Sequence, residues 1–325
     1  MSADTILTST DLTAFFPRLA SGKVRDVYTL SPSTLLFIAT DRISAYDVVL
    51  STGIPGKGRL LTQMSAHWFA VLPSLVPGLR THFVSMALPS ALEENTELAD
   101  VYRGRSMQVR RLKVFPIESI VRGYITGSAW AEYRRSGTVH GGRMREGLRE
   151  SEMLEEPIWT PSTKAEAGSK DENISPEKGK GNALAGTEGL ADSTTAAELI
   201  GQNYASQIRD LSLRIYSAAR DYALERGIII ADTKFEFALD ESTSPPSVVL
   251  VDEVLTPDSS RFWDKEKYEV GRPQESLDKQ YLRDWLTKNK LKGVDGVEMP
   301  REVAERTARG YREAYERLTG ELQQR

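Results

Sequence analysis

Residues 231–237 are Ala-Asp-Thr-Lys-Phe-Glu-Phe, a run in which polar and apolar side chains alternate. Alternation with a period of two predicts a β-strand, here expected over Ile228–Leu239, because successive side chains of a strand point to opposite faces. Asp232, Lys234 and Glu236 then share one face, and the phenylalanines enter a core. The alternative is a solvated strand face that carries unpaired charges.

A partner strand is predicted over Val248–Val254, after a turn near Asp240–Ser247. In this hairpin Glu236 falls opposite residue 251 or 252, so the Asp252 carboxylate approaches it. Cross-strand neighbours lie roughly 5 Å apart at Cβ, and two carboxylates at that separation repel unless a cation or a proton lies between them. Mg²⁺ binds a few carboxylates together with waters and phosphate oxygens. We therefore expect Mg²⁺ on Glu236 and Asp252.

The composition of the whole chain predicts a soluble globular protein of about two domains. It has 325 residues, of which 40% are hydrophobic and 27% charged, with a net charge of −4. The chain lacks the basic footprint that nucleic-acid binding needs. Cysteine is absent, which excludes disulfides, a thiol nucleophile and zinc–thiolate sites. Apolar runs such as Leu35–Ala39 are far shorter than the roughly 20 residues that span a bilayer, and no secretory signal is visible. We expect a cytoplasmic protein with no membrane contact.

Further elements follow from the pattern. Residues 20–50 are predicted to be rich in β-structure, and Val109–Val114 is predicted to be one strand. Long amphipathic helices are predicted over Ala196–Arg226 and Pro300–Leu318. Glu177–Thr195 is predicted to be a mobile surface insertion, because its glycines and polar residues offer little apolar surface to bury.

A glycine turn precedes the first predicted strand, in Gly22-Lys-Val-Arg25. Its backbone amides, together with Lys23 and Arg25, suit a phosphate. Turns of this kind are also common surface features, so that alternative stays open. Gly53–Lys57 is only superficially similar to a P-loop, because the spacing is wrong and Gly58 replaces the Ser or Thr that would bind Mg²⁺.

Two arginines are candidates for binding an anion. Arg122 lies in an apolar run before a Thr-Gly-Ser turn that ends at Ser128. Its partner is either an anionic ligand or a carboxylate in a structural ion pair. Arg261 follows Asp252 closely and is expected near the same site. Thr40–Asp47 gathers polar residues after a predicted strand, where ligand-binding loops are frequent.

Several of these segments resemble one known family. The two most specific are Val114–Ser128 and Ile230–Phe237, and the supporting segments, in family order, are Gly22–Asp26, Ala39–Asp47, Thr160–Lys164, Asp171–Ser175 and Leu250–Trp263. Together they resemble phosphoribosylaminoimidazole-succinocarboxamide (SAICAR) synthetase of the single-function fungal type, from about residue 10 to the C-terminal helix. The chain departs from the family in two places: Ala238 stands where the second signature usually closes with Gly, and Glu177–Thr195 lengthens an active-site loop.

The resemblance implies an ATP-dependent carbon–nitrogen ligase of purine biosynthesis. Such an enzyme joins L-aspartate to 5-aminoimidazole-4-carboxylate ribonucleotide (CAIR) and gives SAICAR, ADP and phosphate. The implied fold is α+β and two-lobed. An antiparallel β lobe for ATP, similar to that of kinases, is expected in residues 1–115, an α/β lobe in 116–262 and a C-terminal helical segment in 263–325. We expect a monomer whose partners are the small-molecule substrates alone.

The resemblance also implies roles for individual residues. Those expected to bind ATP are Gly22, Lys23, Val24, Arg25, Lys113, Val114, Glu236 and Asp252, with Mg²⁺ on the last two. Those expected to bind CAIR or aspartate are Asp41, Arg42, Ser44, Arg122, Ser128, Lys164, Asp232 and Arg261. Among these, Arg122, Ser128 and Arg261 are expected to hold the 5′-phosphate, and Lys164 is expected near the aspartate. The expected catalytic residues are Lys234, Asp232 and Arg25.

Two alternatives belong to other classes of protein. A small-molecule or protein kinase with the same ATP lobe is disfavoured, because the chain has neither a His-Arg-Asp nor an Asp-Phe-Gly motif. A non-catalytic nucleotide-binding protein is disfavoured, because the charged positions of both signatures are intact.

Overall fold

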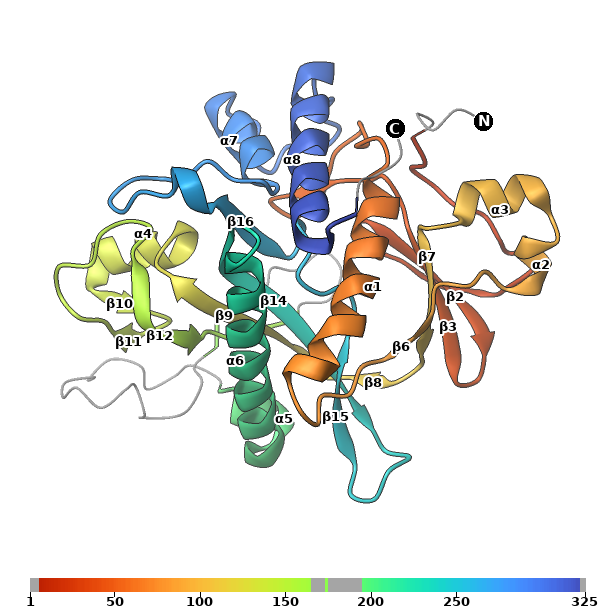
Figure 1. Ribbon diagram of the computed structural model, residues 1–325, viewed down its shortest axis with the longest axis horizontal. Coiled ribbons are helices and arrows are strands. Elements are labelled where there is room, and N and C mark those ends of the chain that lie inside the picture. Colours follow the sequence, from red (N-terminus) through yellow and green to blue (C-terminus); the bar gives the residue numbers. More distant parts are fainter. Residues whose placement is uncertain (1–5, 165–172, 175–194, 322–325) are drawn as a thin grey trace.

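Two antiparallel β-sheets organise the chain in the computed structural model, which describes residues 6–164, 173–174 and 195–321 (Figure 1). The first sheet has the spatial order β1 (Arg18–Ser21), β2 (Arg25–Ser31), β3 (Thr34–Ala39), β7 (Ser106–Arg110) and β6 (Phe83–Ser85). The second has the order β12 (Met153–Trp159), β9 (Ile117–Tyr124), β14 (Ile228–Asp240) and β15 (Ser247–Val251), with β13 (Ser162–Thr163) on β9, and with β8 (Lys113–Val114) and β16 (Ser260–Asp264) on β14.

Short hairpins and helices complete the described part of the chain. The hairpins are β4 (Ser44–Ala45) with β5 (Val48–Val49), and β10 (Thr138–Val139) with β11 (Gly142–Arg143). The helices are α1 (Lys57–Leu75), α2 (Ser90–Glu93), α3 (Thr96–Tyr102), α4 (Gly127–Ser136), α5 (Ala196–Ile200), α6 (Gln202–Leu224), α7 (Gln280–Lys288) and α8 (Arg301–Thr319), with a 3-10 turn at Lys265–Lys267. The α+β class is confirmed, and the predicted division into three parts stays a prediction.

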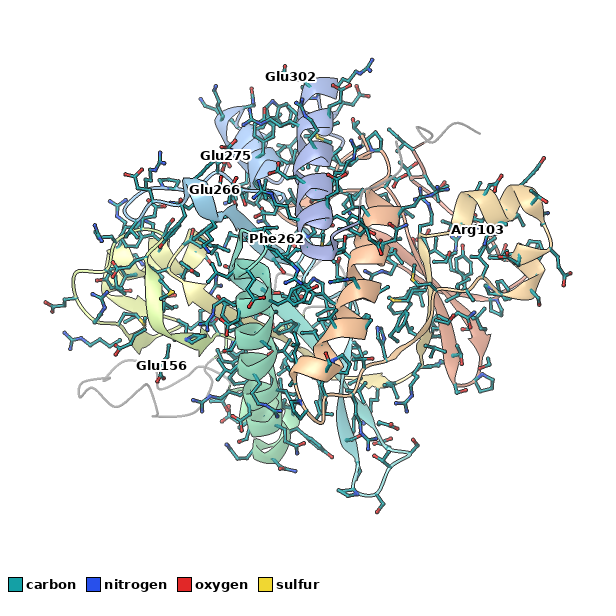
Figure 2. The ribbon with its side chains drawn as sticks, in the orientation of Figure 1. Arg103, Glu156, Phe262, Glu266, Glu275 and Glu302 are labelled. Atoms are coloured by element: carbon teal, nitrogen blue, oxygen red, sulfur yellow. The ribbon has the colours of Figure 1, made fainter. Side chains whose placement is uncertain are left out.

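The hydrophobic core lies between the second sheet and helices α1, α6 and α8, which run in front of β14 (Figure 1). Phe235 and Phe237 of β14 are fully buried in it with Ile208 and Ile215 of α6. Phe262 lies near the centre of the molecule, while the labelled Arg103, Glu156 and Glu302 lie toward its periphery (Figure 2). One face of β14 is therefore committed to the core, as the alternation predicts.

The predicted β-hairpin is confirmed. Strands β14 and β15 pair antiparallel, with Glu236 opposite Val251 and Asp240 opposite Ser247. Residue Asp252 follows the last residue of β15 with a φ of 65°, so the chain turns away there. The turn places Asp252 beside Arg25 of the first sheet.

The single strand predicted over Val109–Val114 is wrong. Strand β7 ends at Arg110 in the first sheet, and β8 pairs with β14 in the second, with Val114 opposite Ala238. The chain crosses between the sheets here, which local propensity does not encode. Ala238, the departure from the family signature, is fully buried beside Val249.

The single helix predicted over Ala196–Arg226 is also wrong. Gly201 adopts a φ of 83° and separates α5 from α6. Helix α5 begins with a capping box, in which the Thr195 side chain accepts from the Glu198 N–H at 3.1 Å and the Glu198 carboxylate accepts from the Thr195 N–H at 2.8 Å. Thr195 is buried, so it belongs to the helix and not to the predicted insertion. Residues 177–194 of that insertion lie outside the described residues.

The predicted C-terminal helix is confirmed as α8. In the described part of the chain, no helix is long and apolar enough to cross a membrane.

Candidate active site

The polar face of β14 carries the candidate site. Lys234 and Glu236 contact each other on this face, while Thr233, on the opposite face, shares a hydrogen bond with Ser260. Because β14 lies between β9, β15 and β16, its polar side chains meet those of three neighbouring strands. The alternative of unpaired, solvated charges is wrong, because every charge on this face has a partner.

Lys234 is the centre of a lysine cluster, which consists of Glu118, Lys164, Lys234 and Glu236. The Lys234 ammonium donates to Glu118 at 2.8 Å and to Glu236 at 2.9 Å. Lys164, which follows β13, donates to the other carboxylate oxygen of Glu236. Burial disfavours the Lys234 ammonium, but Glu236 and then Glu118 outweigh burial and hold its pKa well above the usual value. Lys234 is therefore a fixed positive charge and not a base.

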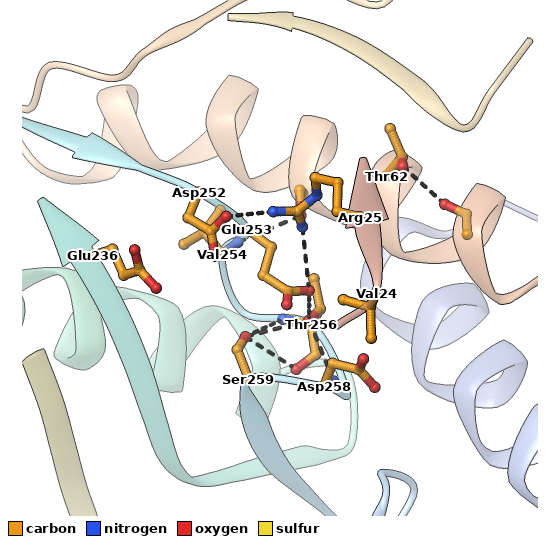
Figure 3. A network of polar contacts seen from close by, with 12 residues as sticks. Val24, Arg25, Thr62, Glu236, Asp252, Glu253, Val254, Thr256, Asp258 and Ser259 are labelled. Carbon is orange, nitrogen blue, oxygen red and sulfur yellow. Dashed lines mark hydrogen bonds and ion pairs between the residues drawn. The ribbon is translucent and has the colours of Figure 1, made fainter. Parts of the chain in front are cut away.

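An ion pair between Arg25 and Asp252 joins the two sheets next to the lysine cluster (Figure 3). Burial disfavours the Asp252 carboxylate, but Arg25 and then Lys234 outweigh it and hold its pKa well below the usual value. The neighbouring Glu253 differs, because burial raises its pKa. The two adjacent carboxyl groups are thus tuned in opposite directions.

The predicted Mg²⁺ ligands, Glu236 and Asp252, lie near each other but contact cations of the protein. Lys164 and Lys234 contact Glu236, and Arg25 contacts Asp252, so protein cations relieve the repulsion that the sequence predicted. Within residues 6–164, 173–174 and 195–321, no three or more Asp, Glu, His or Cys side chains are grouped so as to hold a metal. The magnesium site stays a prediction.

A second group, the arginine cluster, consists of Arg122, Asp232 and Arg261. Arg122 donates to Asp232 at 2.9 Å and to the Thr160 hydroxyl at 3.1 Å. Arg261 donates to the same oxygen of Asp232. Of the two interpretations of Arg122, the buried ion pair is therefore present. Two guanidinium groups share one carboxylate, so the cluster retains a positive charge.

The arginine cluster lies at the beginning of helix α4. Gly127 has a φ of 57°, and a Cβ atom there would lie 2.5 Å from a guanidinium nitrogen of Arg261. Only glycine allows Arg261 to approach the helix so closely. Ser128, the second residue of α4, is exposed at the same helix end. The positive end of the helix dipole thus adds to the charge of the cluster.

The glycine turn is held by Arg42. Arg42 donates to the carbonyl oxygens of Gly22 at 2.9 Å and Lys23 at 3.2 Å, and to Asp26 at 2.9 Å. The side chain of Lys23 is exposed and pairs with Asp47 at 2.7 Å. Arg42 is thus placed to fix the shape of the turn.

The remaining predicted residues lie around the clusters without joining them. Asp41 is fully buried and accepts from Arg105 and from the Gly58 N–H of α1, so its contacts here are structural. Ser44 lies in β4, and Val24 accepts from the Thr40 N–H at 2.9 Å. Lys113 and Val114 are exposed on β8.

The sequence analysis missed two carboxylates of the site. Glu118 lies in a quoted signature, and antiparallel pairing of Lys234 with Ile120 brings it opposite Glu236, so strand parity could have identified it. Glu253 follows Asp252 directly, and Thr256 donates to it at 2.7 Å. Its raised pKa depends on burial by distant elements, so no local pattern signals it.

Comparisons with known proteins all give one family. A family model described as SAICAR synthetase matches residues 18–300. The phosphoribosylaminoimidazole-succinocarboxamide synthase of Pichia angusta is 52% identical over 321 residues, which cover 97% of this chain and 98% of the relative. That of Saccharomyces cerevisiae is 51% identical over 325 residues, with the same coverage of each chain.

Solved structures give the same result. A SAICAR synthase from Saccharomyces cerevisiae, complexed with SAICAR, matches with a TM-score of 0.83 and 48% identity, over 98% of this chain and 100% of that one. A SAICAR synthetase from Pyrococcus horikoshii matches with a TM-score of 0.62 and 24% identity, over 93% of this chain and 100% of that one, and shares its fold.

Proposed function

This chain belongs to the SAICAR synthetase family, and from that premise we propose how its two clusters divide the work of the reaction. The reaction is the ATP-dependent joining of L-aspartate to CAIR in purine biosynthesis. A carboxylate is a poor electrophile, so the CAIR carboxylate needs a better leaving group before an amine can attack it. Phosphorylation by ATP supplies that leaving group. The aspartate amine then displaces phosphate and forms the amide bond.

The lysine cluster and Arg25 act on the phosphates of ATP. Phosphoryl transfer needs chiefly charge neutralisation and positioning. Lys234, whose pKa is held well above its usual value, supplies a permanent positive charge, and Arg25 lies next to it on Asp252. The turn at Gly22–Lys23, in which the Gly22 N–H donates to the Arg25 carbonyl at 2.8 Å, adds the exposed Lys23 ammonium beside Arg25.

Glu236 of the lysine cluster and the neighbouring Asp252 also fit a magnesium ion. Glu236 and Asp252 offer hard oxygen donors from neighbouring positions of one hairpin, and phosphate oxygens and waters would complete the ligand set. Lys164 has a side chain that is 41% exposed, so it has room to leave Glu236. When bound, Mg²⁺ would neutralise charge on the phosphate oxygens.

The arginine cluster holds the ribonucleotide. Arg122 and Arg261 carry more positive charge than Asp232 balances, and they lie at the N-terminus of α4 beside Ser128. A planar guanidinium suits the paired oxygens of a phosphate. Asp232 would then face the imidazole ring of CAIR, between the phosphate site and Lys234.

Aspartate is expected near Lys164. This residue lies at the edge of the lysine cluster, and its N–H donates to the Pro116 carbonyl at 3.1 Å. Of the family segment Asp171–Ser175, the described residues are Asn173, which bridges to Ser162, and the buried Ile174. We also propose that the protein is a cytoplasmic monomer.

The observation that carries the proposal is that both clusters lie on one face of β14. Asp232, Lys234 and Glu236 are two residues apart in turn, so about 7 Å separates successive positions along the strand. The ATP phosphates at the lysine cluster and CAIR at the arginine cluster would therefore meet over the same strand.

One assay tests this proposal against both alternatives. ADP release is measured with CAIR and aspartate together, with each alone, and with other hydroxyl or amine acceptors. Release that needs both substrates supports the ligase. Release with another acceptor indicates a kinase, and tight ATP binding without turnover indicates a non-catalytic protein.

A further inference from the structure

The loop between β15 and β16, residues 252–259, connects the Arg25–Asp252 ion pair to the arginine cluster. Its first residues, Asp252 and Glu253, face Arg25, and Arg261 of the arginine cluster follows its end. Near that end the Ser259 carbonyl accepts from the Lys234 N–H at 3.0 Å. The conformation of this loop therefore sets where the ATP side of the site lies relative to the ribonucleotide side.

Asp258 anchors this loop to the helical layer behind it. Its Oδ2 atom lies 2.7 Å from the ammonium of Lys57, the first residue of α1. Its Oδ1 atom lies 3.6 Å from the ammonium of Lys279, at the start of α7, and accepts from the Tyr311 hydroxyl of α8 at 2.5 Å. One carboxylate thus contacts three helices that are far apart in sequence.

The anchor is buried and charged. The side chains of Lys57, Asp258 and Lys279 are 0%, 3% and 9% exposed. Burial disfavours the Asp258 carboxylate, but Lys279 and then Lys57 outweigh it and hold its pKa well below the usual value. Without its charge, two lysines would be left buried without this partner, which is strongly unfavourable. Burial of apolar surface alone would stabilise the fold without a charged carboxylate between two buried lysines.

The anchor also contacts the loop itself. The Asp258 N–H donates to the Thr256 hydroxyl at 3.3 Å, and that hydroxyl donates to Glu253 at 2.7 Å (Figure 3). Thr256 also accepts, through its carbonyl, from the Ser260 N–H at 2.9 Å. A shift of Asp258 would therefore move both ends of the loop.

We propose that Asp258 is a positioning residue for the ligase reaction, which holds the Arg25–Asp252 ion pair at its working separation from the arginine cluster through its contacts with Lys57, Lys279 and Tyr311. The inference rests on the proposed function. Asp258 contacts neither cluster through its side chain, so each substrate keeps its own contacts when Asp258 is changed. What is lost is the alignment of one substrate with the other.

The test is Asp258→Asn, which keeps the size of the side chain and removes its charge. Misalignment of reacting groups by about 1 Å can cost 100-fold in rate, so we expect kcat to fall about 10-fold or more, with the KM values for ATP and CAIR changed by less than about 3-fold. The matched control is Asp264→Asn, because Asp264 is similarly buried and contacts Arg317 of α8, but lies outside the loop. We expect the control to lower the melting temperature and to leave kcat unchanged.

The outcomes separate this proposal from the proposed function. Wild-type protein without CAIR- and aspartate-dependent ADP release would contradict the function itself. With an active wild type, equal kcat values for Asp258→Asn and Asp264→Asn would overturn the positioning role. A raised KM for one substrate with kcat intact would also overturn it, because that result indicates direct binding. If Asp258→Asn does not fold, Tyr311→Phe removes one hydrogen bond, and kcat should fall about 3-fold. An unchanged kcat in Tyr311→Phe would then overturn the proposal.

Discussion

The lysine cluster and the arginine cluster are built on the same strand, yet the first is electrically balanced and the second carries an excess of positive charge. In the lysine cluster, Lys234 contacts both Glu118 and Glu236, and Lys164 contacts Glu236, with the Arg25–Asp252 pair beside them. In the arginine cluster, two guanidinium groups share one carboxylate. The lysine cluster suits a site where one cation replaces another on the carboxylates, and the arginine cluster suits an anion that is held in a fixed position. Two positions along one strand thus become two kinds of site through their neighbours.

The largest expected effect breaks the lysine cluster. Glu236→Gln should lower kcat by about 100- to 1000-fold, because it removes a carboxylate proposed to hold Mg²⁺, and with it the charge that stabilises the transition state. Replacing Asp252 should have a similar effect. Repulsion between the two carboxylates, as the sequence predicted, would leave such variants stable, but the bonds of Glu236 to two lysines indicate a loss of stability. The measurements are ADP release over a range of Mg²⁺ concentrations and the melting temperature.

The control for that variant lies on the same strand. Asp240→Asn removes a carboxylate that pairs with Arg110 at 2.6 Å, outside both clusters. It should leave kcat within a factor of about two, because Asp240 contacts Arg110 and Ser242 and no member of either cluster. Wild-type activity of Glu236→Gln at ordinary Mg²⁺ would contradict the assignment of Glu236.

The next effect sharpens the contrast between lysine and arginine. Arg261→Lys keeps the charge of the arginine cluster and removes the planar fork, so the KM for CAIR should rise about 10-fold while that for ATP is nearly unchanged. Steady-state kinetics with each substrate varied in turn measures both constants. Equal rises in the two KM values would argue against a ribonucleotide phosphate at this cluster.

A smaller effect concerns stability near the arginine cluster. Burial, and then the charge of Arg122, lower the pKa of His140 from 6.5 to about 4. Between these values the unfolded chain binds a proton and the folded chain does not, so acidification destabilises the fold through this residue. The expected loss is about 2 kcal/mol between pH 7.5 and pH 5.

Urea unfolding at the two pH values measures this loss. His140→Gln cannot titrate there, so its free energy of unfolding should depend less on pH than that of the wild type. The same pH dependence in both proteins would mean that His140 is protonated when folded.

The smallest effect lies outside both clusters. Deletion of residues 177–194 should change the free energy of unfolding by no more than about 1 kcal/mol, because loop-closure entropy varies slowly with length. Any kinetic effect should be in the KM for aspartate, since Lys164 and Asp171–Ser175 precede the deletion. Thr195 must be kept, because Thr195→Ala alone should cost about 1 kcal/mol through loss of the cap. A large fall in melting temperature on deletion would show that the segment packs into the core.

The difference between the clusters also shows what the sequence could predict. Period-two alternation was sufficient to predict strand β14, the face on which Lys234 lies and the hairpin with β15. Strand parity places Glu118 on the same face of β9 as Arg122, but its position opposite Glu236 depends on the register of β9. Thr195 was assigned to the insertion because composition does not distinguish a cap from the loop that precedes it.

Other misses depend on contacts between distant segments. Lys57 looked like part of a failed P-loop, although the structure buries it against Asp258. Gly201 breaks a helical pattern that is otherwise regular. Between Arg110 and β8 the chain crosses from one sheet to the other, although residues 109–114 have the sequence pattern of a single strand. In each case tertiary packing decides the outcome.

The 13 residues of β14 also restrict how this gene can change. A single codon inserted between Asp232 and Thr233 would reverse every later side chain, so that Lys234 would enter the core and Phe235 would enter the site. Length variation can be accommodated in the 241–246 turn, but within β14 only substitutions preserve both faces. The strand is therefore a segment in which insertions and deletions should be absent among functional variants.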